Sequence, residues 1–239
     1  MGLSIPSHYG MLKQKLLIVA ATRVAPNPFM ESMPLGRSLR RISFDRRVEV
    51  RPAFNNRDGL PAVYNRQISE GNRDKMLLFV HDDVWLDDCF VCDRVAEALG
   101  VFDIVGLAGN TRRTPRQPAW GFSIETPFKP EERRFLSGIV SDGDQPLGKP
   151  SRYGPPGLRC LSLDGVFIAV RCATLLDSGV RFDERFMFDF YDLDFCRSAE
   201  AAGLRMGTWP IAITHASLGQ FGSPNWHAAL SHYREKWGD

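Results

Sequence analysis

A short apolar run that stops at three potential metal ligands constrains this sequence more than any other feature. Residues 77–80, Leu-Leu-Phe-Val, are typical of a buried strand, and His81, Asp82 and Asp83 follow at once. Carboxylates at the point where a strand leaves an apolar core need a stabilising partner, because burying an unpaired charge is costly. The sequence predicts either that these acids cap a turn or a helix, or that they bind a metal ion.

Strand-like and helix-like segments alternate through the first half of the chain. Strand patterns cover 16–21, 47–54, 76–80 and 101–109, and helix patterns cover 34–42, 59–71 and 87–99. This alternation predicts an α/β domain with a mixed, mostly parallel central sheet and helices on both faces. Ligands of such open sheets bind beyond the carboxyl ends of the strands, which is where Asp82 and Asp83 are expected. Asp87 and Asp88 are expected to begin the helix that follows.

The second half begins with a long segment that lacks clear periodicity. Residues 110–159 contain many of the prolines and a cluster of arginines. This composition predicts either a solvated surface loop or a flexible flap that meets an anionic ligand. Order returns with a strand pattern over 161–170, interrupted by Asp164-Gly165, then a helix pattern over 192–202 and a last strand that leads to His215.

Length and composition bound the class of protein. The 239 residues suit one large domain or two small ones, and the formal net charge of +2 favours neither nucleic acid nor a membrane surface as a partner. The odd number of cysteines, 5, and their irregular spacing indicate a reducing compartment, and we expect a cytoplasmic protein. No apolar run reaches the roughly 18–20 residues of a membrane span.

Two groups of side chains are candidates for chemistry. His81, Asp82 and Asp83 together with His215 could hold Mg²⁺ or Mn²⁺, since these ions take oxygen ligands and accept some nitrogen. Asp192, near a predicted helix start, could act as a general base on a hydroxyl group. Each acid also has a structural interpretation, as a helix cap or a partner of the helix dipole, and the residue types alone leave both interpretations open.

The order and spacing of these segments resemble the inverting glycosyltransferases of family 2, which have the nucleotide-sugar-binding GT-A fold. The similarity is closest to a compact branch with a His-Asp-Asp metal motif. Together the matching segments cover most of the chain from about residue 60 to 222. They are AVYNRQISEGNRDKMLLFVHDDVWL, IVGLAGN, LDGVFIAVRCATLLDSGVRFDERFMFDFYDLDFCRSAEAAGLRMG and ITHASLG.

The resemblance implies a single domain over 1–239, with a nucleotide-binding half at about 13–100 and a donor and acceptor half at about 101–222. It also implies a nucleotide-diphosphate sugar donor, a hydroxyl acceptor such as a carbohydrate, and Mn²⁺ or Mg²⁺. Asp83 would bind the metal with His81, which takes the place of the motif's first acid, and His215 would complete the metal shell.

The remaining implied roles concern the two substrates. Asp82 would lie against the ribose or the donor sugar, and Asp164-Gly165 would line the donor and acceptor pocket. Asp192 would be the catalytic base, with Tyr191 in place of the usual Glu. The residues expected near the nucleotide base are Ala21, Thr22, Arg23, Asn55 and Asn56.

Three alternatives remain at this stage. The first is a degenerate member of the same fold that binds a nucleotide sugar or a carbohydrate without turnover, since His81 and Tyr191 both depart from the usual motif. A sugar nucleotidyltransferase is less favoured, because the segment AATRVAPNPF after the first strand has no glycine. A phosphatase would need its D-x-D after an early strand, whereas Asp192-Leu193-Asp194 comes late. Dinucleotide oxidoreductases are disfavoured because the sequence has no G-x-G-x-x-G.

Overall fold

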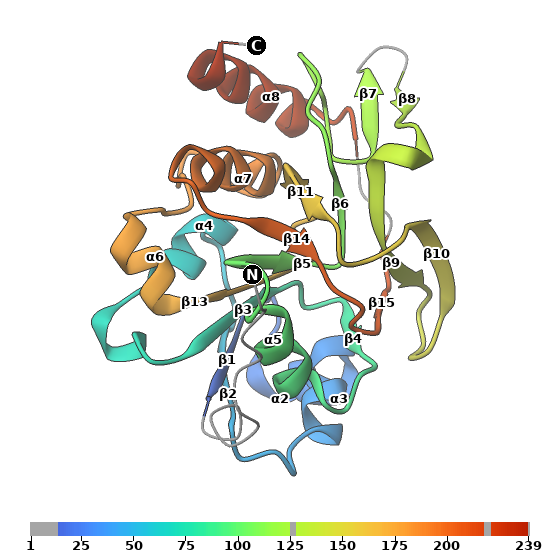
Figure 1. Cartoon of the computed structure of the whole chain (residues 1–239). Coiled ribbons are helices and arrows are strands. Elements are labelled where there is room, and N and C mark those ends of the chain that lie inside the picture. The colour runs from blue at the N-terminus through green and yellow to red at the C-terminus, as the bar shows by residue number, and fades with distance from the viewer. Residues whose placement is uncertain (1–13, 125–127, 218–220, 239) are drawn as a thin grey trace, which may run out of the picture.

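A seven-stranded sheet forms the centre of the protein in the computed structural model, which describes residues 14–124, 128–217 and 221–238 (Figure 1). In spatial order its strands are β11 (Arg159–Cys160), β14 (Met206–Thr208), β5 (Ile104–Gly106), β13 (Phe167–Arg171), β3 (Met76–Val80), β1 (Leu16–Ala21) and β2 (Val48–Ala53). The pairings make β14, β5, β3, β1 and β2 run in one direction and β11 and β13 in the other. The predicted mixed, mostly parallel sheet is therefore confirmed.

Helices cover both faces of this sheet, because its buried strands send alternate side chains to opposite sides. Ile18 and Leu78 belong to a cluster on one face, and Val19 and Phe79 belong to a cluster on the other. The first cluster includes residues of α2 (Pro26–Ser32), α3 (Pro34–Arg41) and α5 (Val91–Ala98). The second includes residues of α4 (Leu60–Asn65), α6 (Cys172–Ser178), α7 (Tyr191–Ala201) and α8 (Pro224–Trp237).

A second sheet continues from the first and determines where the acidic motifs lie. Its strands are, in order, β12 (Ser162–Leu163), β6 (Ala108–Asn110), β9 (Leu136–Asp142), β15 (Ile213–His215) and β4 (Val84–Leu86), with β10 (Lys149–Gly154) paired to β9. The chain passes from the first sheet to the second at His81–Asp83, between β3 and β4. It returns at Asp164–Val166, between β12 and β13. Asp82-Asp83 and Asp164-Gly165 therefore occupy crossings between the two sheets.

The segment 110–159 is more regular than its sequence indicates. It contains the short hairpin of β7 (Phe122–Ile124) and β8 (Lys129–Pro130), the 3₁₀ turn η2 (Arg133–Phe135) and the longer hairpin of β9 and β10. Pairing of β9 with β6 and β15 orders this region, and such long-range pairing leaves little trace in local periodicity. Gly138 in β9 has φ +102°, and an added Cβ there would lie 1.8 Å from the Leu107 carbonyl oxygen. The expectation of a wholly irregular segment is wrong for 136–154, and flexibility or ligand contact elsewhere in it stays a prediction.

Two predicted helix boundaries differ from the structure. The helix expected over 59–71 is shorter, because α4 ends at Asn65 and a separate 3₁₀ turn, η1, covers Glu70–Asn72. Asp87 and Asp88 do not cap α5, whose N-cap residue is Phe90. Asp87 instead accepts a hydrogen bond from the Thr214 hydroxyl at 2.6 Å and so joins β15 to the end of β4.

The division into halves at 13–100 and 101–222 stays a prediction, and residues 13, 125–127 and 218–220 within it lie outside the described part of the chain. None of the helices in the described ranges is both long enough and apolar enough to cross a membrane.

Candidate functional site

Strand pairing brings His81, Asp83 and His215 together. His215 lies opposite Val84 in the antiparallel pair of β15 and β4, so it is next to Asp83, and Ala216 N–H extends this ladder to the Asp83 carbonyl at 3.0 Å. One potential ligand atom from each of the three residues lies within 4.8 Å of the others. The three residues form what we call the ligand cluster. The predicted metal ligands are thus neighbours, although His215 follows the other two by more than 130 positions in the sequence.

The chemistry of the ligand cluster suits a divalent cation such as Mn²⁺. Two imidazoles and one carboxylate form a mixed nitrogen and oxygen set, which transition metals accept readily. Asp83 Oδ1 is buried and accepts no well-directed hydrogen bond from any described residue, although His215 Nε2 lies 3.3 Å away. A buried carboxylate oxygen without a hydrogen bond is costly unless a cation compensates it. The residues present therefore fit a bound cation.

The surroundings favour the ionised form of Asp83. Burial raises the pKa of this carboxyl, but the proximity and charge of His215 and the hydroxyl of Ser217 outweigh it and lower the pKa to about 2. Ser217 Oγ donates to Asp83 Oδ2 at 2.5 Å. Burial lowers the pKa of His81, which favours the neutral imidazole that a metal requires. For His215, burial also acts to lower the pKa, but the contact with Asp83 raises it overall.

The residues expected to meet the nucleotide gather at the ends of β1 and β2. Thr22 N–H donates to the Ala53 carbonyl at 2.9 Å, and Asn56 N–H donates to the Thr22 carbonyl at 2.8 Å. Ala21 ends β1. A hollow of about 440 Å³ next to them is lined by Arg23, Asn55, Asn56 and Arg57.

Asp82 lies between these residues at the ends of β1 and β2 and the ligand cluster. Burial raises the pKa of its carboxyl, and a hydrogen bond with the Thr22 side chain opposes that rise. Its backbone carbonyl accepts a hydrogen bond from Leu35 N–H at 3.1 Å, at the start of α3. Neither Asp82 nor Asp83 lies at a helix N-terminus, so helix capping does not explain this acid pair.

Asp192 lies in the first turn of α7, and its environment differs from that of Asp83. Gly165 N–H donates to Asp192 Oδ2 at 3.0 Å, and Leu193 N–H donates to Oδ1 at 2.8 Å. Burial and the nearby charge of Asp164 raise the pKa of Asp192 to about 7, although the backbone hydrogen bonds lower it. The N-cap position of α7 belongs to Phe190, so Asp192 is not the N-cap. A carboxyl group that titrates near neutral pH is suited to accept a proton in catalysis.

Asp164 and Gly165, at the crossing between β12 and β13, lie beside Asp192 and are fixed by close contacts of their own. Asp164 accepts hydrogen bonds from Trp120 Nε1 and from Val166 N–H, both at 2.9 Å. Gly165 has no room for a side chain, because an added Cβ would lie 2.3 Å from the Tyr191 hydroxyl and 3.0 Å from Asp192 Cβ. Glycine therefore permits the close approach of α7 to this crossing.

Sequence reasoning missed Ser217 and Trp120, which contact the predicted site, and noted Tyr191 only as a departure from the motif. Ser217 bonds to Asp83, Trp120 bonds to Asp164, and the Tyr191 hydroxyl lies 2.9 Å from His81 Nε2. Ser217 is only two positions after His215, so its proximity in sequence was an available signal. Trp120 lies in the segment without periodicity, and its contact with Asp164 becomes evident only in the folded structure.

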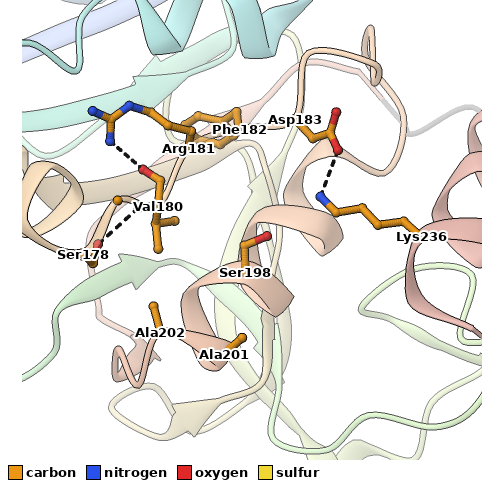
Figure 2. A pocket seen from close by; sticks show the side chains of 10 residues that line it. Ser178, Val180, Arg181, Phe182, Asp183, Ser198, Ala201, Ala202 and Lys236 are labelled. Carbon is orange, nitrogen blue, oxygen red and sulfur yellow. Dashed lines mark hydrogen bonds and ion pairs between the residues drawn. The ribbon is translucent and has the colours of Figure 1, made fainter.

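A different hollow, of about 540 Å³, lies between α6, α7 and α8 (Figure 2). Its basic side chains already have partners. Lys236 binds Asp183 at 2.9 Å, and Arg181 donates to the carbonyls of Leu175 and Val180 at 2.9 Å. None of the residues of the ligand cluster lines this hollow, and Asp192 does not line it either. We therefore assign the candidate site to the sheet crossings and not to this hollow.

No family model matches the sequence, and no curated protein matches it. Among solved structures, the chain is similar to the mannosyltransferase PcManGT from Pyrobaculum calidifontis in complex with GDP-Man and Mn²⁺, with a TM-score of 0.51 and 12% identity over 95% of this chain. It is also similar to GalNAc-T7 with UDP, GalNAc and Mn²⁺, with a TM-score of 0.50 and 10% identity over 95% of this chain. The protein has the GT-A glycosyltransferase fold. It spans 66% of the first of these chains and 49% of the second, and at these identities the likeness establishes the fold alone.

Proposed function

We propose that this protein is a metal-dependent, inverting glycosyltransferase that moves a sugar from a nucleotide-diphosphate donor to an acceptor hydroxyl. One observation carries the proposal: a cation-type ligand cluster and a carboxyl group with a pKa of about 7 are joined by a short series of contacts. His81 contacts Tyr191, Tyr191 contacts Gly165, and Gly165 contacts Asp192. The GT-A fold of the nucleotide-sugar transferases named above supports the same assignment.

The donor is proposed to lie along the ends of β1 and β3. Arg23, Asn55 and Asn56, which line the smaller hollow, would contact the nucleotide together with Ala21 and Thr22. Asp82, next to Thr22, would contact the ribose or the donor sugar.

The ligand cluster His81, Asp83 and His215 would hold Mn²⁺ or Mg²⁺. The bound cation would neutralise the negative charge that develops on the departing nucleoside diphosphate.

Asp192 is proposed as the general base, with Asp164 and Gly165 beside it. It would take the proton of the acceptor hydroxyl, whose oxygen then forms a bond to the anomeric carbon of the donor as the bond to the diphosphate breaks. Each Asp192 oxygen accepts one backbone hydrogen bond and can accept a second, which leaves capacity for the acceptor. The two backbone bonds fix the orientation of the carboxylate before the acceptor arrives.

A thermal-shift panel tests the donor side of this proposal. Purified protein is measured with UDP, GDP, TDP or CDP, each with and without Mn²⁺ or Mg²⁺. We expect one nucleotide to stabilise the protein only when the cation is present. A ligand at about 100 times its dissociation constant adds about 2.7 kcal/mol to the free energy of unfolding. Absence of any cation-dependent shift would contradict the proposal.

Turnover separates the enzyme from a binding module of the same fold. The nucleotide that gives the shift is supplied as its diphosphate sugar, and release of nucleoside diphosphate is followed with and without candidate carbohydrate acceptors. Transfer, or slow hydrolysis of the donor, supports an enzyme, and inversion is then read from the anomeric configuration of the product. Binding without either reaction would indicate a degenerate member.

We also propose a reducing, cytoplasmic location, which the odd number of cysteines supports.

A further inference from the structure

The hydroxyl of Tyr191 makes two hydrogen bonds that together determine where His81 carries its proton. Tyr191 Oη lies 2.8 Å from the Gly165 carbonyl oxygen and 2.9 Å from His81 Nε2. A carbonyl oxygen can only accept a hydrogen bond, so Tyr191 must donate to Gly165. A phenol has one proton to donate. His81 Nε2 must therefore carry a hydrogen and donate it to Tyr191.

The alternative arrangement of protons is unfavourable. If Tyr191 donated to His81 Nε2, the lone pairs of the hydroxyl and of the Gly165 carbonyl would face each other at 2.8 Å, in a buried setting. An unsatisfied buried acceptor costs about 1–3 kcal/mol. The imidazole can exchange its donor and acceptor positions by changing tautomer, whereas the carbonyl cannot.

We propose that Tyr191 is a positioning residue that fixes His81 in the tautomer with the proton on Nε2, so that Nδ1 is the atom offered to a cation. The inference rests on the proposed function, because it concerns the metal site of that function. The inference adds to the proposed function the ligand atom of His81 and a role for Tyr191 in cation affinity. Hydrogen bonds from the second nitrogen of a metal-bound histidine commonly set its orientation and basicity.

Gly165 permits the close contacts on which this arrangement depends. Its lack of a side chain lets the Tyr191 hydroxyl approach, since an added Cβ would lie 2.3 Å from that oxygen. The N–H of the same residue donates to Asp192. Gly165 therefore orients two side chains. Its carbonyl orients Tyr191, which in turn orients His81, and its N–H orients Asp192, the proposed base.

The tautomer is measured directly in the metal-free protein. Protein labelled with ¹⁵N-histidine is examined by long-range ¹H–¹⁵N NMR, and His81→Asn identifies the His81 signals. We expect the wild-type protein to show a protonated Nε2 and an unprotonated Nδ1 at His81. In Tyr191→Phe we expect a mixture of tautomers. A wild-type His81 protonated on Nδ1 would overturn the inference, even if Tyr191→Phe fails to fold.

Cation affinity is the second measurement. Mn²⁺ binding is followed by the loss of the free-ion electron paramagnetic resonance signal. We expect Tyr191→Phe to bind Mn²⁺ about 10–100-fold more weakly than the wild type. Tyr233→Phe is the matched control, because it removes the hydroxyl of another buried tyrosine, in α8, and we expect it to retain wild-type affinity.

A double-mutant comparison separates positioning from general destabilisation. If Tyr191 acts through His81, adding Tyr191→Phe to His81→Asn should weaken Mn²⁺ binding no further. An equal loss in both backgrounds would contradict the inference. Failure of the wild-type protein to bind Mn²⁺ would instead contradict the proposed function, so the two failures are distinguishable.

Discussion

Asp83 and Asp192 are both partly buried, and contacts between His81, Tyr191 and Gly165 link their surroundings. Their carboxyl groups nevertheless differ in acidity. The pKa of Asp83 is about 2, whereas the pKa of Asp192 is about 7. Burial raises the pKa of both, so their neighbours account for the difference. Asp83 is next to the imidazole of His215 and the hydroxyl of Ser217. Asp192 has two backbone N–H donors, but it also lies near the charge of Asp164.

Two aspartates in one region can therefore be suited to different tasks. A carboxylate that stays ionised at every physiological pH is suited to hold a cation, and one that titrates near neutrality is suited to take a proton. Hydrogen bonds of Gly165 with Tyr191 and with Asp192 connect the two regions. If the interpretation is right, substitutions on the two sides should affect different measurements.

The largest effect is expected for Asp83→Ala. Removing this carboxylate deletes the only acid of the ligand cluster within the described residues, so we expect cation-dependent nucleotide binding to fall by at least about 100-fold. The measurement is the thermal shift with nucleotide and Mn²⁺. Asp144→Ala, at an exposed aspartate of the β9–β10 turn, is the control and should keep the wild-type shift. Retention of the shift in Asp83→Ala would remove the distinction between the two acids.

Asp192→Asn should instead separate binding from turnover. The amide has nearly the same shape but cannot take a proton, and its NH₂ group replaces one of the two oxygens that accept backbone hydrogen bonds. We therefore expect turnover to fall by about 10²-fold or more. Nucleotide and Mn²⁺ binding, measured by thermal shift, should remain close to wild type because the ligand cluster is unchanged. Turnover near the wild-type value would show that Asp192 is not the base.

The sequence was most informative where a segment determines its own structure. The apolar runs 16–21 and 76–80 predict β1 and β3 because a buried strand has a continuous apolar pattern. The interruption at Asp164-Gly165 correctly marked a break between strands, β12 and β13. The alternation of such segments predicted an α/β domain, and the resemblance to a known family implied the GT-A fold.

What the sequence could not provide depends on contacts between distant segments. His81 and Tyr191 look like two unrelated departures from a motif, yet a contact of 2.9 Å joins them across 110 positions. The hairpin of β9 and β10 is likewise stabilised by pairing with β6 and β15, and not by its own composition. The pKa of Asp192, in α7, depends on Asp164, which lies 28 positions earlier at the crossing between β12 and β13.

The pH dependence of stability gives a third, smaller contrast. The folded pKa of Asp192 is raised to about 7 from the usual 3.8, so folding favours its protonated form. Its contribution to stability is therefore fully present below about pH 4 and is lost as the pH rises through about 7. Between pH 5 and 8 we expect the metal-free wild type to lose about 1–3 kcal/mol relative to Asp192→Asn, measured by urea unfolding. Parallel pH profiles for the two proteins would mean that Asp192 is ionised throughout this range.

The smallest effect is expected at Phe188, whose ring lies 5.5 Å from the ring of His81 and is 57% exposed. Its neighbour Met187 is anchored by the hydrogen bond from Leu60 N–H to the Met187 carbonyl at 2.9 Å, so the aromatic side chain is presented from a fixed backbone.

An exposed aromatic ring at this position can pack on an apolar face of an acceptor sugar, and burying a few tens of Å² of apolar surface contributes roughly 1 kcal/mol. We expect Phe188→Ala to raise the KM for a carbohydrate acceptor about 2–10-fold, with donor hydrolysis and Mn²⁺ binding unchanged. Phe44→Ala, which removes a ring that is 62% exposed after α3, is the matched control. An unchanged acceptor KM in Phe188→Ala would mean that the acceptor reaches Asp192 from a direction that avoids Phe188. A parallel loss of Mn²⁺ binding would instead place Phe188 with the ligand cluster, as a residue that supports the ring of His81.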